Sequence, residues 1–228
     1  MKKTLTMLTI LAIHLSASNL FLHQFFNNKQ CDQILRNDGY FTTCYSYKNK
    51  GAKYVAYTLE GTKVNLKNIK KRPRFYEDLH IPKQYRSKPS DYTHNFFHAD
   101  RGHLAPDAAF DYSHKSLHAI YTMSNIIPQH YSLNRGIHAW RGLEKYGRYL
   151  AVKLGKINVL NGVEYSKSPQ TIGRDKISIP SAFWKMYYNT SKHFQKCFYF
   201  KNKPEIKGKK IKDYQINCKK LINYSIIH

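Results

Sequence analysis

Aromatic and β-branched residues near the start of the chain predict a β-hairpin. Residues 40–47 (YFTTCYSY) and residues 54–59 (YVAYTL) are both rich in side chains that favour strands. The polar segment 48–53 (KNKGAK) contains a glycine, as a turn between two strands would. Residues 19–38 are polar and aromatic with few apolar positions, and we expect a short helix there.

The middle of the chain passes from an irregular to a helical pattern. Residues 63–95 are basic and carry several prolines and turn residues, which predicts a long surface connection of the kind that often carries function. The segment from about Ser132 to Leu150 has the length and the periodicity of a helix, despite its three glycines.

Two further extended segments follow the predicted helix. Residues 156–161 (KINVLN) predict a strand that ends at Gly162. Residues 176–189 (KISIPSAFWKMYYN) predict an extended stretch, a turn at Pro180 and another strand. Since the chain of 228 residues has no internal repeat and no low-complexity linker, a single domain is the simplest account.

The N-terminus has the pattern of an export signal. Lys2 and Lys3 precede an apolar run over residues 5–15, and small residues at 16–18 suit cleavage. Residues 1–18 are therefore predicted to be a signal peptide, which implies a bacterial periplasm or the extracellular space. The apolar run is shorter than the roughly 20 residues of a permanent anchor, although an uncleaved N-terminal anchor stays a possible alternative.

Export would allow the four cysteines to form disulfides. Four cysteines permit three connectivities. The preferred pairing joins Cys31 to Cys44 and Cys197 to Cys218, because each local loop then ties down one end of the mature chain.

Charge is the strongest global signal in the composition. Lys and Arg number 38 against 14 acidic residues, which gives a formal net charge of +24. Such a field attracts polyanions, and nucleic acid, lipopolysaccharide and glycosaminoglycan all fit it. Heavy use of lysine on solvated faces is the alternative reading. The segment 196–220 holds nine lysines against Glu205 and Asp213 and predicts a folded basic flap.

The segment HADRGHLAPDAAF (98–110) carries the most concentrated candidate chemistry. The pKa of a histidine lies near neutrality, so His103 could take a proton from water. Arg101 offers a planar fork for phosphate oxygens, and Gly102 permits a close backbone approach. In an extended stretch Arg101 and His103 point to the same side and Asp100 to the other, where it could hold its neighbours. A plain surface turn would explain the same four residues without any chemistry.

The wider context of this motif resembles the DNA/RNA non-specific endonuclease family. After DRGHLAP come SNIIPQ and LNRG, with Asn125 and Asn134 nine residues apart as in the family pattern. The upstream segments RPRFYED (72–78) and SDYT (90–93), and the later IPSAFWKMYY (179–188), match as well. The resemblance covers residues 40–190 and implies an α+β fold of the ββα-metal class. Such a fold has a central antiparallel sheet with flanking helices and long loops.

The resemblance also implies a division of labour within a nuclease site. His103 would be the general base, Arg101 would stabilise the phosphate charge, and Asp100 would support the site from behind. Asn134 would be the direct protein ligand of Mg²⁺, or of Mn²⁺ or another divalent cation. Asn125 would position the base or its loop. The reaction would be hydrolysis of DNA, with RNA as a further candidate substrate, and would leave 5′-phosphate ends.

Two positions depart from the family pattern or stay open. The pattern places a Trp four and an acid eight residues after the metal-binding Asn, whereas Trp140 and Glu144 follow Asn134 by six and ten. A bulge or a late helix start near Gly136 could restore the register, so Glu144 is kept as a ligand acting through water. Arg72 and Arg74 both fit the family's remote arginine, with a preference for Arg74.

The resulting expectation is a single nuclease domain over residues 19–228. Its core would span 40–190, and a basic, disulfide-tied segment would span 191–228. The rival hypothesis is a secreted polyanion-binding protein that has kept the fold and lost the activity.

Overall fold

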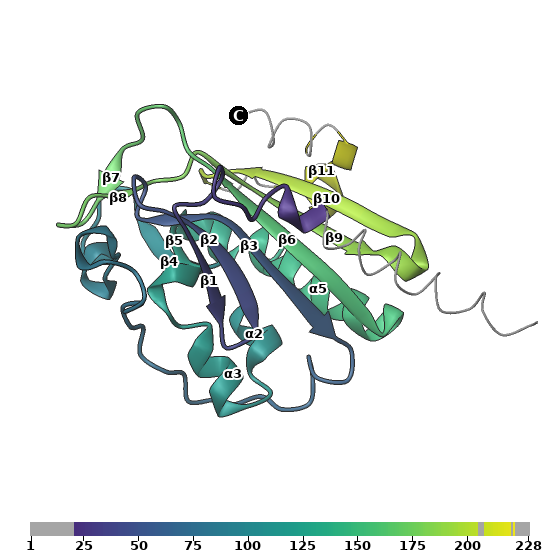
Figure 1. Ribbon diagram of the computed structural model, residues 1–228. Helices are drawn as coiled ribbons and strands as arrows, with labels where there is room; N and C mark the ends of the chain where they lie inside the picture. Colours follow the sequence, from purple (N-terminus) through teal and green to yellow (C-terminus); the bar gives the residue numbers. More distant parts are fainter. Residues whose placement is uncertain (1–20, 205–207, 220, 222–228) are drawn as a thin grey trace, which may run out of the picture.

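A seven-stranded antiparallel sheet organises the protein, and its strand order is β1-β2-β3-β6-β9-β10-β11. The computed structural model describes residues 21–204, 208–219 and 221, so the predicted signal peptide lies outside the described residues. Figure 1 shows the long strands side by side, with α5 behind them and β4 and β5 at one end. The domain limits proposed from the sequence remain predictions.

The predicted hairpin is confirmed by β2 (Phe41–Ser46) and β3 (Gly51–Glu60), which pair in antiparallel register. The helix expected over residues 19–38 is wrong for its second half, where β1 (Gln33–Asn37) lies. This short stretch pairs with β2 along its whole length, from Gln33 opposite Tyr45 to Asn37 opposite Phe41. The extended conformation of this stretch therefore depends on its pairing with β2. The local sequence pattern does not indicate that pairing.

The next strands of the sheet are β6 (Lys156–Glu164) and β9 (Ala182–Asn189). The strand predicted to end at Gly162 continues through that residue. Gly162 lies opposite Trp184, and a Cβ at position 162 would collide with the indole ring. The glycine thus belongs inside the strand, where it lets the largest side chain of β9 lie across the sheet. The turn predicted at Pro180 is confirmed, because it separates β8 (Ile177–Ser178) from β9.

The basic flap predicted over residues 196–220 is in its first part a strand of the main sheet. Strand β10 (Phe194–Lys201) pairs with all eight residues of β9, and β11 (Gln215–Ile216) then pairs with β10 at the edge. The turn η5 (Ile211–Tyr214) precedes β11. Burial of alternate aromatic side chains of β10, such as Phe198 and Phe200, explains why this lysine-rich segment is folded.

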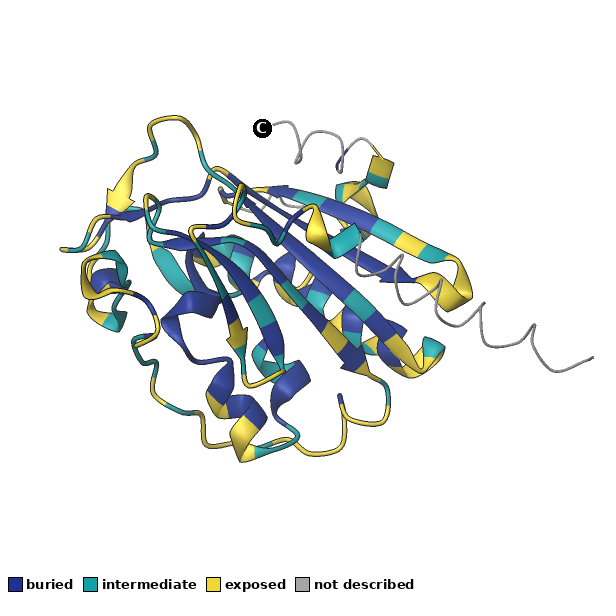
Figure 2. Ribbon diagram, viewed as in Figure 1, coloured by how far each residue is buried: buried dark blue, intermediate teal, exposed yellow. Residues whose placement is uncertain are grey.

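The two faces of the sheet are covered differently. One face carries the larger core, in which Val55, Phe183 and Tyr187 pack with Trp140 of helix α5. The other face packs against the N-terminal segment, where Phe25 contacts Trp184. Figure 2 shows the central strands buried along most of their length, with the exposed positions gathered at turns. The helices and the candidate site lie on the first face.

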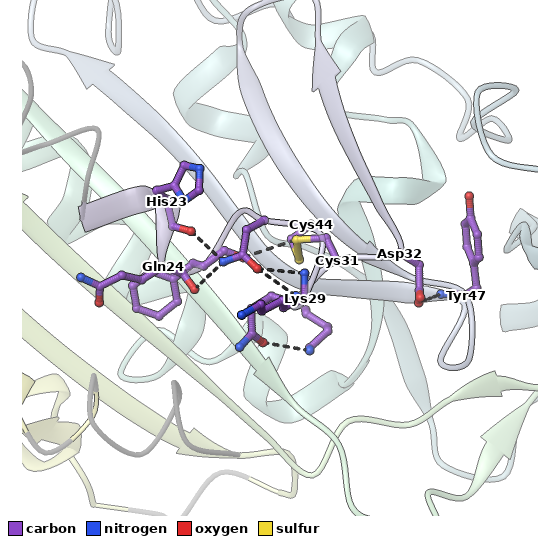
Figure 3. Close-up of a disulfide and its surroundings, with 11 residues drawn as sticks. His23, Gln24, Lys29, Cys31, Asp32, Cys44 and Tyr47 are labelled. Atoms are coloured by element: carbon purple, nitrogen blue, oxygen red, sulfur yellow. Dashed lines mark hydrogen bonds between the residues drawn. A yellow bond between two sulfur atoms is a disulfide. The ribbon is translucent and has the colours of Figure 1, made fainter.

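Both preferred disulfides are present, Cys31–Cys44 and Cys197–Cys218. The first joins the N-terminal segment to β2 (Figure 3). Beside it, the Asp32 carboxylate accepts a hydrogen bond of 2.8 Å from the backbone N–H of Tyr47. These links hold the start of the described chain against the sheet.

The single helix predicted over residues 132–150 is wrong, because it is two helices. Helix α4 (Tyr131–Arg135) ends at Gly136, whose backbone is extended, and α5 (Trp140–Leu154) begins four residues later. A Cβ on Gly142 would collide with the carbonyl group of Ile137. The connecting loop therefore folds back tightly onto the first turn of α5, and this contact sets the elbow between the two helices.

The remaining elements are short. Helices α2 (Asp107–Phe110) and α3 (His114–Ala119) cover one end of the sheet, and the turn η3 (Met123–Asn125) follows them. Residues 63–95 form the predicted irregular connection, broken by the turns η1 (Lys83–Tyr85) and η2 (Pro89–Tyr92). Two minor pairs complete the fold: β4 (Ala99–His103) with β5 (Ile126–His130), and β7 (Thr171–Ile172) with β8. Among the described residues, no helix is long and apolar enough to span a membrane.

Candidate active site

The DRGH motif forms strand β4, which pairs with β5 and carries the site. His103 lies opposite Ile126, and Asp100 lies opposite Gln129. Gly102 is buried, and a Cβ there would strike the side chain of Gln129. The glycine of the motif is thus required because a buried side chain of the partner strand occupies the space.

His103 sits between two aromatic rings, with ring centroids 5.4 Å from Phe75 and 4.9 Å from Tyr121. Its Nε2 atom is buried and has no hydrogen-bond partner among the described residues. Burial lowers the pKa of His103 to about 3, and the nearby charge of Arg72 lowers it further in the same direction. The imidazole is therefore neutral at pH 7 and keeps a lone pair that can accept a proton.

The low pKa of His103 predicts that acid destabilises the fold. The unfolded chain takes up this proton near pH 6.5, and the folded chain does so only near pH 3. The unfolded state therefore binds more protons in this window, and stability falls as the pH drops through it. We expect the titration of His103 to contribute a loss on the order of 2 kcal/mol between pH 7 and pH 5, measured by urea unfolding as the difference between the wild type and a variant without this imidazole.

The matched variant for this measurement is His103→Gln, which cannot titrate. Its stability should fall less over the same range, because the lowered pKa of His130 and the raised pKa of Glu144, which act in opposite directions, are common to both proteins. Equal losses in the wild type and the variant would contradict the assignment.

An arginine approaches His103 from the irregular connection. The Nη2 atom of Arg72 lies 2.7 Å from Asp107 Oδ1 and 3.1 Å from Asp111 Oδ2. The Tyr121 hydroxyl donates to the other oxygen of Asp107. Through Asp107, Arg72 is thus linked to Tyr121, whose ring contacts His103. Arg74, the arginine preferred from the sequence, makes none of these contacts among the described residues.

Arg101 lies on the His103 side of β4, as the alternation of side chains predicts. Its guanidinium carbon is 5.5 Å from the ring centroid of Phe75, the residue that also contacts His103. Its Nε and Nη2 atoms donate to the carbonyl oxygen of Pro89 at 3.2 and 2.8 Å. Because a guanidinium has five N–H donors, donors remain for an anion beside His103.

Asp100 holds the neighbouring helix α4. Its Oδ2 atom accepts a hydrogen bond of 2.9 Å from the amide nitrogen of Asn134. The carboxylate also binds Arg135 in a fork, with distances of 2.8 and 2.6 Å. A carboxylate only accepts hydrogen bonds, so the NH₂ group of Asn134 must face Asp100, and its carbonyl oxygen is left as an oriented ligand. Asp100 therefore orients Asn134 and Arg135 of α4, and this is the form that its expected supporting role takes.

Asn125 fixes the loop that leaves His103. It is fully buried, its Oδ1 accepts from Ala105 N at 2.8 Å, and its Nδ2 donates to Ala105 O at 3.0 Å and to Ile120 O at 2.9 Å. All polar atoms of this side chain are used within the protein. Asn125 is thus a positioning residue, in keeping with the role expected for it.

Glu144 lies one helical turn after Trp140, whose Nε1 donates to the carbonyl oxygen of His103 at 3.2 Å. Burial raises the pKa of Glu144 to about 7, against the opposing charges of Lys185 and Arg148, and Asp107 raises it further. The carboxyl group of Glu144 therefore lies near Asp107, the acid that contacts both Arg72 and Tyr121. The contact of Glu144 with a metal stays a prediction.

Lys185 is the main residue of this region that the sequence reading missed. It is fully buried, its Nζ is 4.3 Å from the ring centroid of Trp140, and it donates to the Tyr57 hydroxyl at 3.3 Å. Burial lowers its pKa to about 8, and Glu144 opposes that shift. The signal was a single lysine inside the apolar strand AFWKMYY, where a buried charge requires a compensating partner.

The pairing of Glu144 with Lys185 can be tested by stability. Replacing Glu144 with glutamine should cost on the order of 3 kcal/mol, because it leaves the ammonium group of Lys185 buried without its counter-charge. Adding Lys185→Met should recover most of that loss in the double variant. Thermal or urea unfolding of the two single variants and the double variant measures the coupling, and additive losses would show that the groups do not interact.

The fold and the site define the class of protein. β4 and β5 lie next to α4, three hydrogen bonds from Asn134 and Arg135 to Asp100 tie the helix to β4, and the architecture is that of a ββα-metal nuclease. The model of the DNA/RNA non-specific endonuclease family matches residues 18–226, and the chain belongs to this family. The family resemblance and the fold class expected from the sequence are therefore confirmed.

Individual proteins of the family are similar over most of the chain. The mitochondrial endonuclease G of Homo sapiens is 29% identical over 157 residues, which are 64% of this chain and 51% of the relative. The salivary endonuclease of Lutzomyia longipalpis is 28% identical over 204 residues, which are 78% of this chain and 48% of the relative. The chain thus spans about half the length of these relatives.

A solved structure supports the fold independently. A crystal structure of the EndoG/EndoGI complex matches with a TM-score of 0.70 and 21% identity, and covers 81% of this chain and 80% of the other. At this identity the match concerns the architecture. Among the described residues, no group of three or more His, Cys, Asp or Glu side chains is arranged to hold a metal ion.

Proposed function

We propose that this protein is a metal-dependent endonuclease that hydrolyses phosphodiester bonds of DNA and RNA. The observation that carries the proposal is the pairing of a neutral imidazole, whose Nε2 atom is buried, with an oriented amide oxygen. His103 Nε2 lacks a partner among the described residues, and Asp100 fixes the amide of Asn134 on the adjoining helix.

His103 acts as the general base. Its Nε2 atom accepts a proton from water while the water oxygen forms a bond to phosphorus. The bond from phosphorus to the 3′ oxygen breaks, and that oxygen leaves and takes up a proton. The products are a 5′-phosphate and a 3′-hydroxyl. Phe75 and Tyr121 hold the imidazole in place, and the Trp140 indole fixes the backbone carbonyl of the same residue.

Arg101 binds the phosphate that undergoes attack. Its contacts to Pro89 and Phe75 hold the guanidinium in one place and leave further N–H donors. Charge that develops on the phosphate oxygens during attack is stabilised by such a preoriented cation. Arg72 lies behind the base and adds to the positive field at the same point.

Asn134 holds the divalent cation, for which Mg²⁺ is the first candidate and Mn²⁺ the second. A site with one amide oxygen suits Mg²⁺, which keeps several of its waters. When bound, the cation supplies charge stabilisation for the phosphate and the leaving oxygen. Glu144 would hold one of its waters.

We also propose that the protein is exported. The N-terminal signal pattern and the two disulfides both fit an oxidising compartment outside the cytoplasm. Sequencing the N-terminus of the protein recovered from a cell fraction tests this, and a mature chain beginning near Asn19 is the expected result.

The proposed reaction is tested by its products. End-labelled DNA and RNA strands should both be cut at internal positions in the presence of Mg²⁺. Each product should then be a substrate for a phosphatase at its 5′ end. Products with 3′-phosphates, or release of single nucleotides from one end alone, would rule out the proposed chemistry.

A further inference from the structure

A groove lies at the edge of the sheet, beside the elbow of α4 and α5. Its volume is about 320 Å³. The residues used below line it: Leu133, Lys201, Lys203, Lys209, Asp213 and Tyr214. We call this the C-terminal groove. It lies between the end of β10 and the turn η5, next to the edge strand β11 (Figure 1).

The wall of the groove is anchored to the strand that leads into the candidate site. Asn202 is buried, and its Nδ2 donates to the carbonyl oxygens of Pro128 at 3.0 Å and Pro180 at 2.9 Å. Its Oδ1 accepts from the backbone N–H of His130 at 2.9 Å. Lys201 and Lys203 flank this anchor in the chain and are exposed.

The other wall is anchored to the start of α5. The side chain of Ile211 covers Gly142, where a Cβ would lie 3.0 Å from its Cδ1 atom. The floor is Leu133, the residue that precedes the proposed metal ligand Asn134 in α4. The C-terminal segment is thus anchored to β5 by Asn202 and to the start of α5 by Ile211, and the groove lies against α4, the helix that carries Asn134.

The chemistry of the groove suits a phosphate backbone. Three lysines line it against one acid, and the Oδ2 atom of that acid, Asp213, accepts the backbone N–H of Lys210 at 2.8 Å. The ring of Tyr214 stacks on Phe200 with centroids 4.3 Å apart, and Lys209 Nζ is 5.1 Å from the Tyr214 centroid. A row of ammonium groups next to an aromatic ring is typical of surfaces that bind single-stranded nucleic acid.

We infer that the C-terminal groove is a second contact for the substrate strand, outside the site of cleavage. It binds the phosphates of nucleotides to one side of the scissile bond. This inference rests on the proposed nuclease function. Because the groove lies against α4, which carries Asn134, the strand that reaches it is one that already occupies the site of cleavage. Its consequence is a preference for substrates long enough to reach from the site to the groove.

The test replaces the three groove lysines with glutamine together (Lys201→Gln, Lys203→Gln, Lys209→Gln). For a single strand of about 20 nucleotides, KM should rise about tenfold with kcat unchanged. A trinucleotide, too short to reach the groove, should be cleaved as by the wild type. In EDTA, binding of the long strand by fluorescence anisotropy should show a salt slope reduced by about two, at about 0.7 for each lost phosphate contact.

A matched control removes the same charge elsewhere, with Lys153→Gln, Lys156→Gln and Lys192→Gln at the opposite end of the sheet. All three control lysines are exposed, and this variant should behave nearly as the wild type does. Equal effects of the two triple variants, or none from the groove variant, would overturn the inference. Loss of heparin binding with strand binding intact would instead assign the groove to sulfated polysaccharide and also overturn it.

The two proposals fail in different ways. If the wild type cleaves no strand, the nuclease function fails, and the binding measurement in EDTA still decides the groove. If the wild type cleaves long and short strands with the same KM, the groove inference fails and the nuclease function stands.

Discussion

Replacing His103 with alanine is expected to lower the rate of phosphodiester cleavage about 1,000-fold, within the range for loss of a general base. Within the part of the chain that the structure describes, no other imidazole is in contact with Phe75 and Tyr121. Water in the space left by the ring would accept the proton poorly. The rate is measured by nicking of supercoiled DNA with Mg²⁺ present, over times long enough to detect the residual activity.

The control for this variant is His193→Asn. His193 is exposed in the turn between β9 and β10, and its backbone is left-handed with φ of 47°, which asparagine tolerates. This variant should keep full activity, and circular dichroism should show that both variants are folded. Added imidazole should partly restore cleavage by His103→Ala. Strong residual cleavage without imidazole would assign the base to another group.

Replacing Asn134 with alanine is expected to be the second large loss, on the order of 100-fold or more in kcat. The substitution removes the oriented amide oxygen and also the hydrogen bond of 2.9 Å to Asp100. Affinity for the divalent cation should therefore fall together with the rate. Titration with Mn²⁺, followed by its electron paramagnetic resonance signal, measures the binding directly.

Asn158→Ala is the matched control for that titration. Asn158 also makes one side-chain hydrogen bond, to Thr58 at 2.8 Å, but it lies within the main sheet. Its cation affinity and its activity should match those of the wild type. If Asn134→Ala titrated like the wild type, the cation would be bound elsewhere, and the proposed role of Asn134 would have to be abandoned.

Local sequence patterns predicted the parts of this protein that depend on neighbours in the chain. The hairpin of β2 and β3 follows from two runs of β-preferring residues with a glycine-containing turn between them. The shared face of Arg101 and His103 follows from the alternation of a strand, and their common contact with Phe75 agrees with it. The disulfide pairing was likewise obtained from local spacing.

Features that depend on contacts between distant segments could not be predicted in the same way. The break between α4 and α5 arises because the Ile137 carbonyl group packs against Gly142, and no propensity reports such a contact. The continuation of β6 through Gly162 depends on an indole ring from β9. In both cases a glycine that weakens a helix or strand locally is required by what lies across from it.

The same distinction between local sequence and long-range contacts applies to the candidate site. The motif itself identified Asp100, Arg101 and His103, whereas Asp107, Tyr121 and Lys185 gain their importance only through the fold. Burial raises the pKa of Glu144, Lys185 opposes that shift and Asp107 adds to it, whereas the pKa of His103 is lowered by burial and by Arg72. The role of Glu144 stays a prediction: its spacing from Asn134 departs from the family pattern, and its carboxyl group interacts electrostatically with Asp107.

The proposed nuclease activity is best tested by incubating the wild-type protein with supercoiled plasmid, in the presence of Mg²⁺ or of EDTA. With Mg²⁺ we expect nicked circles and then linear fragments, and with EDTA we expect the plasmid to stay supercoiled. A plasmid that stays supercoiled in both reactions, although the protein binds it, would rule out internal cleavage and favour a polyanion-binding protein without nuclease activity.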